Sequence, residues 1–233
     1  MSKVIGLIGA MDEEIELLLA AMVRTGEFTK AGIRYVTGTI AGHDVVLCKS
    51  GVGKVNVAVT TQVMIDHFDV NKVLFTGVAG AVDPELNIGD IVISSECMQH
   101  DMDVTALGFA RGVIPYQEVS AFQADEQLIT LAEEACKALG EGQYRIGRVL
   151  SGDQFVASRE VVASLYEQLQ GACVEMEGAS VAQVCYMNQI PFVIIRSMSD
   201  KADGSADVNF AEFTVASSHR SHQIIDYMLN HLN

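Results

Sequence analysis

Two apolar segments that each end in acidic residues, with a helix between them, constrain the fold of this chain most. The first begins at Cys173 and reads CVEME, an alternation typical of a strand that places both glutamates on one side. Gly178 opens a helix of small apolar residues, and a second strand begins at Phe192 and ends at Asp200. Ligands of open α/β sheets bind beyond the carboxyl ends of the strands. The sequence therefore predicts a site that contains Glu177 and Asp200.

The predicted helix also bears on the charge of Glu177, which directly precedes Gly178. A helix N-terminus carries partial positive charge and favours an anion beside it. We therefore expect Glu177 to be ionised.

Helices and strands alternate along the whole chain, and no linker, repeat or low-complexity segment interrupts them. This pattern predicts an α/β protein, a single three-layer α/β/α domain over residues 1–233. We expect strands at residues 4–9, 35–40, 44–49, 72–75, 89–97 and 144–150. We expect helices from residue 12 onward and at 54–67, 125–139, 159–169 and 210–232, with an irregular excursion at 98–121.

Charge and cysteine usage exclude several classes of protein. A formal net charge of −15 argues against nucleic acid as a partner, because such proteins neutralise phosphates with Lys and Arg. The five cysteines form no CxxC pair and lie mostly in apolar segments, which predicts buried free thiols in a reducing cytosol. The N-terminal apolar run of about seven residues is too short for a signal peptide or membrane anchor. We expect a cytoplasmic protein with no membrane partner.

Two glycine-rich segments follow predicted strands. Residues 77–80 read GVAG and have little side-chain bulk, so a ligand could approach the backbone there, although turns are often glycine-rich as well. Residues 50–54 read SGVGK, but Leu47 stands where a phosphate loop needs its first glycine. We therefore expect a tight strand-to-helix turn at 50–54 and a candidate binding loop at 77–80.

Histidines and acidic residues do not form a recognisable metal site. Residues 100–103 read HDMD, and His219 and His222 are three apart on a predicted helix. Neither set has a complete ligand count at a known spacing, so we predict no metal, and we expect His219 and His222 to be solvated.

Three carboxylates remain as candidates for chemistry: Glu14, Glu177 and Asp200. Each alone would be typical of a capping or surface residue. Together, at the ends of different apolar segments, they suit glycosidic chemistry, in which one acid protonates a leaving group, one base activates water and a third residue orients the sugar.

At these residues the sequence closely resembles the bacterial 5′-methylthioadenosine/S-adenosylhomocysteine nucleosidases, within the nucleoside phosphorylase superfamily. The resemblance covers nearly the whole chain and implies a central mixed, twisted sheet, a homodimer and no cofactor. The matching segments are IGAMDEE at residues 8–14, SGVGKV at 50–55, TGVAG at 76–80, HDMDVTA at 100–106, SGDQF at 151–155, VEME at 174–177 and RSMSD at 196–200.

The resemblance implies hydrolysis of the N-glycosidic bond of methylthioadenosine and S-adenosylhomocysteine to adenine and a 5-thioribose, and cleavage of the same bond in 5′-deoxyadenosine. These reactions belong to methionine salvage and methyl-cycle recycling. By the same resemblance, Glu14 is the base that activates water, and Asp200, held by Ser199, is the acid that protonates adenine N7. Glu177 holds the ribose hydroxyls, supported by Arg196. A helix N-terminus lowers the basicity of Glu14 and a dry pocket raises it, and the sequence leaves that balance open.

The remaining expected contacts are also implied by the resemblance. Phe155 stacks on adenine, whose edge is read by backbone groups of Phe155 and Val156. The expected substrate-binding set further contains Glu175, Met176, Met11, Val52, Val78, Ala79, Gly80 and Phe210. Val104, Leu107 and Pro115 are expected to close the 5′ pocket of the partner subunit.

Departures from the family pattern leave the 5′ substituent of the substrate open. Val78 replaces a common Ser, and Leu107 and Phe109 replace a bulkier Phe and a Tyr. The segments GVAG, SGDQF and VEMEGAS look more like members that also cleave 6-amino-6-deoxyfutalosine in menaquinone synthesis. Two further alternatives are a nucleoside phosphorylase, disfavoured because the charge of Glu14 would repel phosphate, and a silent nucleoside-binding protein, disfavoured because all three carboxylates are present.

Overall fold

The computed structural model describes residues 3–140, 143–202 and 206–232, and its strands form one mixed sheet. Most strands carry β-branched and aliphatic residues, and most helices follow a strand directly, as in other α/β proteins. In chain order the strands are β1 (Val4–Gly9), β2 (Val23–Lys30), β3 (Ile33–Ile40), β4 (His43–Lys49), β5 (Val70–Ala81), β6 (Ile91–Gln99), β7 (Ala121–Gln123), β8 (Tyr144–Ser151), β9 (Gly171–Glu175) and β10 (Phe192–Asp200).

Six α-helices and one short 3₁₀-helix, η1 (Thr105–Leu107), are present among the described residues. Side-chain caps set the start of two of them: Asp125 accepts the amides of Gln127 and Leu128, and Ser158 accepts the amide of Val161. The α-helices are α1 (Asp12–Ala21), α2 (Lys54–Phe68), α3 (Glu126–Leu139), α4 (Arg159–Leu169), α5 (Gly178–Asn188) and α6 (Ala206–His231).

The long strand β5 determines the shape of the sheet. It pairs in parallel with β1 and β10 along most of its length, and its last residues, Gly80 and Ala81, pair antiparallel with β9. Since β10 continues through β6 and β8 to β9, the sheet closes on itself at that end, while β1, β4, β3 and β2 extend from the other side. The closure brings the carboxyl ends of β5, β9 and β10 together.

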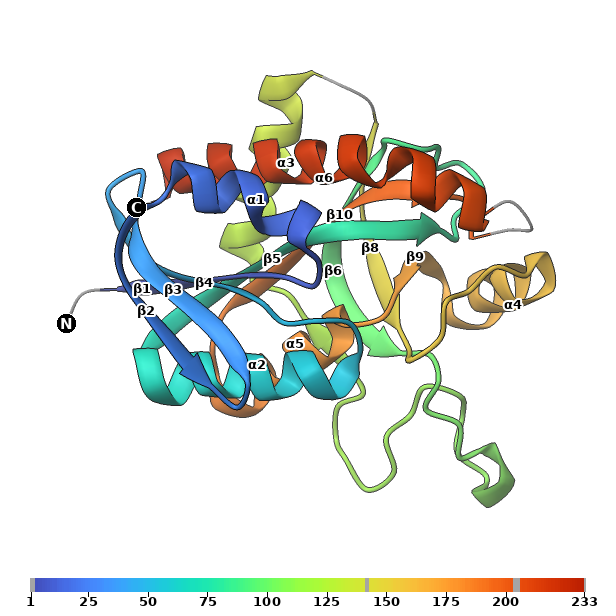
Figure 1. Ribbon diagram of the computed structural model, residues 1–233. Helices are drawn as coiled ribbons and strands as arrows, with labels where there is room; N and C mark the ends of the chain where they lie inside the picture. Colours follow the sequence, from blue (N-terminus) through green and yellow to red (C-terminus); the bar gives the residue numbers. More distant parts are fainter. Residues whose placement is uncertain (1–2, 141–142, 203–205, 233) are drawn as a thin grey trace.

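Helices cover both faces of the sheet (Figure 1). One apolar core contains Val57 and Met64 of α2 with Val181 and Cys185 of α5. A second core on the opposite face contains residues of α1, α3 and α6, among them Leu18. The predicted three-layer α/β/α arrangement is therefore confirmed.

The element predictions were largely confirmed, with four corrections. Strand β7 was not predicted, because it is only three residues long and begins where the expected irregular excursion ends. Strand β2 was missed because nearly all of its side chains are exposed, so no apolar alternation marks it. Residues 77–80 were expected to form a loop but continue β5, where they are buried between neighbouring strands. Strand β9 ends at Glu175, so Glu177 lies at the start of α5 rather than on the strand.

No helix among the described residues combines the length and the apolar character needed to cross a bilayer.

Leu74 of β5 is buried against both neighbouring strands and the second core. Replacing it with Ala should lower the free energy of unfolding by about 2–5 kcal/mol, because a cavity remains in a closely packed interior. The same truncation at Val23, exposed on β2, should change it by about 0.5 kcal/mol or less. Urea denaturation at fixed protein concentration measures both values, and equal values for the two variants would contradict this placement of the core.

Candidate active site

A cavity opens where the carboxyl ends of β5, β9 and β10 meet the start of α1. This is the position that the sequence predicted for a site. The cavity brings together nearly all of the predicted site residues. Its lining consists of Ala10, Met11, Glu14, Val52, Val78, Ala79, Gly80, Gln154, Phe155, Val156, Val174, Glu175, Met176, Glu177, Ser199, Asp200 and Phe210.

Glu14 is held by backbone amides from two elements. Its Oε2 accepts the amides of Ala10 at 2.6 Å and Met11 at 3.0 Å, and its Oε1 accepts the amide of Val78 at 3.0 Å. Burial raises the pKa of Glu14, and the Arg196 charge and these three amides oppose that rise without cancelling it. The balance left open by the sequence is therefore decided in favour of a more basic carboxylate.

The two glycines of the GVAG segment give the carboxylates room. A Cβ on Gly77 would overlap Glu14 Oε1 and lie 3.0 Å from Arg196 Nη1, and a Cβ on Gly80 would lie 2.8 Å from Asp200 Oδ1. Because these glycines have no side chain, Glu14 and Asp200 of the same protein can lie close to the backbone there. The glycines are part of strand β5 and not of a binding loop.

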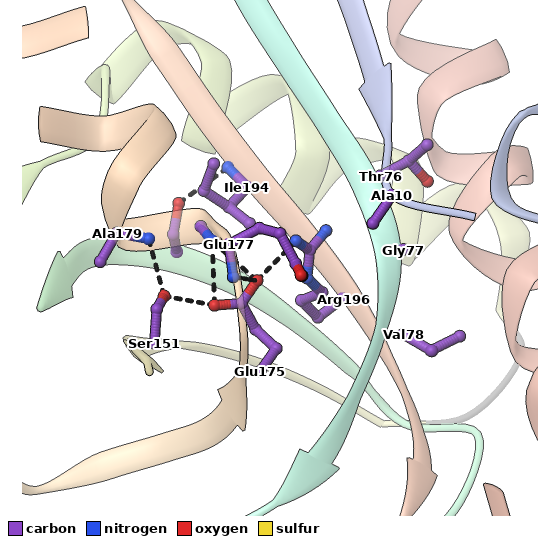
Figure 2. A network of polar contacts seen from close by, with 12 residues as sticks. Ala10, Thr76, Gly77, Val78, Ser151, Glu175, Glu177, Ala179, Ile194 and Arg196 are labelled. Atoms are coloured by element: carbon purple, nitrogen blue, oxygen red, sulfur yellow. Dashed lines mark hydrogen bonds and ion pairs between the residues drawn. The ribbon is translucent and has the colours of Figure 1, made fainter. Parts of the chain in front are cut away.

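Glu175 and Arg196 form a buried ion pair behind the cavity (Figure 2). Arg196 Nη2 lies 2.7 Å from Glu175 Oε2, and the guanidinium carbon lies 3.9 Å from the centre of the Phe75 ring. Arg196 does not line the cavity, and its ion pair is with Glu175; its charge also favours ionisation of Glu177, the residue that it was expected to support.

Glu175 stabilises the N-terminus of α5. Its carboxylate accepts the amides of Glu177 and Gly178, at 3.2 Å and 2.8 Å for Oε2, together with the hydroxyl of Ser151. Ser151 Oγ also accepts the Ala179 amide at 2.7 Å. The anion that the helix N-terminus binds is therefore Glu175, and not Glu177 as predicted.

Glu177 is buried, and its Oε1 accepts the Gly53 amide at 2.7 Å. Burial, and secondarily the neighbouring Glu175, raise the pKa of Glu177 to about 8, against the Gly53 hydrogen bond and the Arg196 charge. The raised pKa therefore acts against the ionised form of Glu177 that was expected.

Asp200 lies on the other side of the cavity, at the end of β10, and is 3% exposed. Its Oδ2 accepts the Ser199 hydroxyl at 2.8 Å, the contact that was expected, and its Oδ1 accepts the Ala202 amide at 2.7 Å. These contacts fix the carboxyl group on the cavity wall.

Apolar side chains form the rest of the lining. The rings of Phe155 and Phe210 meet edge to face with centroids 5.7 Å apart, and Phe155 is 52% exposed. Sequence reasoning missed Ala10, Gln154 and Val174, each of which directly adjoins a predicted residue. Ala10 contributes a backbone amide, for which a sequence carries no side-chain signal.

The comparisons with known proteins agree with this geometry. The sequence profile of the Phosphorylase superfamily matches residues 4–230. The chain belongs to the phosphorylase superfamily. Within the superfamily it is 44% identical over 222 residues to the 5′-methylthioadenosine/S-adenosylhomocysteine nucleosidase of Lysinibacillus sphaericus, covering 95% of this chain and 96% of the relative.

Two solved structures of superfamily relatives superimpose closely on this chain. The nucleosidase of Neisseria meningitidis in complex with methylthio-immucillin-A has a TM-score of 0.94 at 38% identity, covering 99% of this chain and all of the relative. The futalosine hydrolase of Helicobacter pylori has a TM-score of 0.95 at 35% identity, covering 100% of this chain and 99% of the relative.

The other candidate residues of this superfamily member lie outside the cavity. Val104, Leu107 and Pro115 belong to the segment between β6 and β7, which extends away from the sheet, and Leu107 is 71% exposed (Figure 1). No group of three or more possible metal ligands occurs among the residues that the structure describes. His219 is exposed, as expected. His222 is half-buried, contrary to the expectation that it is solvated, and burial lowers the pKa of His222.

The raised pKa of Glu177 can be tested by measuring protein stability as a function of pH. Because this pKa is about 8 in the folded chain and ordinarily 4.5, its stabilising contribution is present below about pH 4.5 and is lost as the pH rises through about 8. Glu177→Gln cannot ionise. The free energy of unfolding of wild type minus that of Glu177→Gln should therefore decrease between about pH 5 and pH 9 in denaturant titrations. A difference that stays constant with pH would show that Glu177 has an ordinary pKa.

Proposed function

We propose that this chain hydrolyses the N-glycosidic bond of 5′-methylthioadenosine and S-adenosylhomocysteine, and of 5′-deoxyadenosine, releasing adenine and the 5-thioribose or corresponding ribose. This activity belongs to methionine salvage and methyl-cycle recycling. One observation carries the proposal: Glu14, Glu177 and Asp200 converge on a cavity in which none of the described lining residues is Lys or Arg. The names of the relatives in Lysinibacillus sphaericus and Neisseria meningitidis support the same reaction.

In the proposed reaction Glu14 and Asp200 move the protons. Glu14 takes a proton from water as the water oxygen bonds to the anomeric carbon, and the bond from that carbon to adenine N9 breaks. Asp200 donates its proton to adenine N7, so that adenine leaves as a neutral molecule. The raised pKa of Glu14 makes it a stronger base than an ordinary carboxylate.

Glu177 is the proposed partner of the ribose hydroxyls, with Met176 against the sugar. A protonated carboxyl can both donate and accept hydrogen bonds, so it suits a pair of hydroxyl groups. Positive charge developing on the ribose would lower the pKa of Glu177 and favour its ionised form, which in turn stabilises that charge. The buried position of Glu177 strengthens this interaction.

The adenine ring is proposed to lie against Phe155, with its edge toward the backbone of Phe155 and Val156. Phe155 is half-exposed and stands beside Phe210. A planar base would cover apolar surface on this ring, which favours binding by stacking. Met11 and Val52 complete the apolar wall.

Phosphorolysis is the less favoured reaction in this cavity. A phosphate dianion needs cationic or hydroxyl donors, and Arg196, the nearest buried guanidinium, is 1% exposed and engaged with Glu175. Glu14 instead presents a carboxylate that would repel phosphate. Water is therefore the proposed nucleophile.

We also propose that the protein acts as a homodimer in which Val104, Leu107 and Pro115 close the 5′ pocket of the partner subunit. In support, these residues lie away from their own chain's cavity, and Leu107 and Tyr116 in the same segment are largely exposed. Exposed apolar side chains at a loop tip are favourable where a second surface covers them.

A cytoplasmic location is proposed because the cysteines are free thiols. All five cysteines are free, and Cys48, Cys97, Cys173 and Cys185 are buried. Burial raises the pKa of the buried Cys185 thiol, as expected of inert structural cysteines in a reducing compartment.

Substitution of the two proton-transferring residues tests the mechanism. Glu14→Gln and Asp200→Asn should each reduce kcat for adenine release by about 10²–10⁴-fold, because neither replacement can exchange the required proton. Nucleoside binding, followed by calorimetry, should persist in both. Glu16→Gln, an exposed position on the same helix, is the matched control and should turn over normally. Near-normal turnover in Glu14→Gln or Asp200→Asn would refute the role of that residue.

A second candidate function is hydrolysis of 6-amino-6-deoxyfutalosine, as in menaquinone synthesis. It is favoured by the similarity to the futalosine hydrolase of Helicobacter pylori and by Val78, which leaves no hydroxyl at its position in the cavity. The chemistry at the glycosidic bond would be the same, and only the 5′ substituent differs.

Adenine release in phosphate-free buffer should distinguish these substrates. We expect similar kcat/KM values for methylthioadenosine, S-adenosylhomocysteine and 6-amino-6-deoxyfutalosine, because the three carboxylates act on the part that they share. A strong preference for the futalosine compound would establish the second function instead. Release only after phosphate is added would refute hydrolysis altogether.

A further inference from the structure

Three residues from distant parts of the chain fasten the start of α2 to the turns after β6 and β8. The Lys54 ammonium lies 2.7 Å from Asp101 Oδ1, and Asp101 Oδ2 accepts the Asp153 amide at 3.0 Å. Asp153 Oδ1 accepts the Lys54 amide at 2.8 Å. Each of the three residues thus contacts the other two, and we call Lys54, Asp101 and Asp153 the clamp.

The ion pair of the clamp is shielded from solvent. The Lys54 and Asp101 side chains are 19% and 15% exposed, whereas the Lys49–Asp12 pair is 44% and 78% exposed. Burial acts to raise the pKa of Asp101, but the Lys54 hydrogen bond, the Asp153 amide and the Lys54 charge outweigh it, so the pKa of Asp101 is lowered. The clamp therefore holds an ionised carboxylate, whereas burial raises the pKa of Glu14 and Glu177 in the cavity.

A second contact of Lys54 ties the clamp to α5, the helix that Glu177 precedes. Lys54 Nζ donates to Gln99 Oε1 at 3.0 Å, and Gln99 Nε2 donates to Gln183 Oε1 at 2.6 Å. The start of α2 is therefore fixed relative to the helix that follows Glu177.

The residue before Lys54 carries the only hydrogen bond to the Glu177 carboxyl among the described residues. Gly53 donates its amide to Glu177 Oε1 at 2.7 Å and has a φ of 101°, a conformation that favours glycine. A flexible residue can direct its amide only if its neighbours are fixed. The clamp fixes the neighbour, because it binds both the backbone and the side chain of Lys54.

We propose that Lys54 and Asp101 are positioning residues that aim the Gly53 amide at Glu177 and so set how Glu177 meets the ribose. Neither residue lines the cavity, so they act through Glu177 and do not touch the substrate. The proposal rests on the proposed function, in which Glu177 binds the ribose hydroxyls.

Discrimination between two substrates tests the proposal. We would measure kcat/KM for methylthioadenosine and for its 2′-deoxy counterpart, and take the ratio of the two values. Glu177→Ala should lower this ratio, because the hydroxyl partner is lost. Lys54→Met and Asp101→Asn should also lower it by about tenfold, since a small misplacement of a binding group is costly. An unchanged ratio in both clamp variants would overturn the proposal.

The ratio separates positioning from a general effect on folding. A smaller folded fraction lowers both kcat/KM values equally and leaves their ratio unchanged. Lys137→Met, which breaks the 2.9 Å pair with Glu133 on α3, is the matched control and should keep the wild-type ratio. Wild-type protein that releases no adenine would refute the proposed function, a result distinct from failure of the clamp.

A double variant tests whether the clamp acts through Glu177. Adding Asp101→Asn to Glu177→Ala should lower the ratio no further, since the group that the clamp positions is already absent. A further fall of similar size would show that Asp101 acts by another route, and would overturn the proposal.

Discussion

The buried ion pair between Arg196 and Glu175 is the interaction on which the rest of the site depends. Arg196 stands opposite Gly77 in the register of β10 and β5, and the missing side chain there leaves space for the guanidinium beside Glu14. Glu175 uses the same carboxylate to bind Arg196 and the first amides of α5. Breaking a buried pair on one side leaves an uncompensated charge, so strand, helix and carboxylates are set as one unit.

This pair also explains why the other acidic groups behave differently. Among the described residues, the Arg196 charge acts on three acidic side chains, Glu14, Glu175 and Glu177, and its hydrogen bond to a carboxylate goes to Glu175. Burial then raises the pKa of Glu14 and of Glu177, because too little positive charge remains to offset it. With little positive charge nearby, Glu14 and Glu177 hold their protons more tightly than ordinary carboxyl groups do, a property that suits acid–base catalysis.

Helices and strands were predicted correctly where the apolar residues show a strong period. The predictions failed where a segment has no such period or is buried by residues distant in the sequence. Alternation and helical spacing located most strands and helices, but the exposed strand β2 carried no such signal. The GVAG segment reads as a loop from its composition, yet it is a strand because its backbone pairs with β10 and β9. Its glycines leave space for Glu14 and Asp200. Glu177 was expected to be the anion at the start of α5, but only the fold shows that Glu175 reaches the helix amides first. The resemblance named most of the residues that line the cavity, but it did not indicate that Arg196 pairs with Glu175.

Two motifs that are ambiguous in the sequence form an ion pair with each other in the structure. SGVGK suggests a phosphate loop because it offers a glycine and a lysine, and HDMD suggests a metal site because it offers acidic ligands. In the fold, the cation of the first is bound by the carboxylate of the second, Lys54 to Asp101, across 47 residues of sequence. Each motif therefore supplies the counter-ion that the other lacks, and neither needs phosphate or metal to satisfy its charge. Gly53, next to Lys54, donates its amide to Glu177, which connects a pairing outside the cavity lining to the orientation of a group inside it.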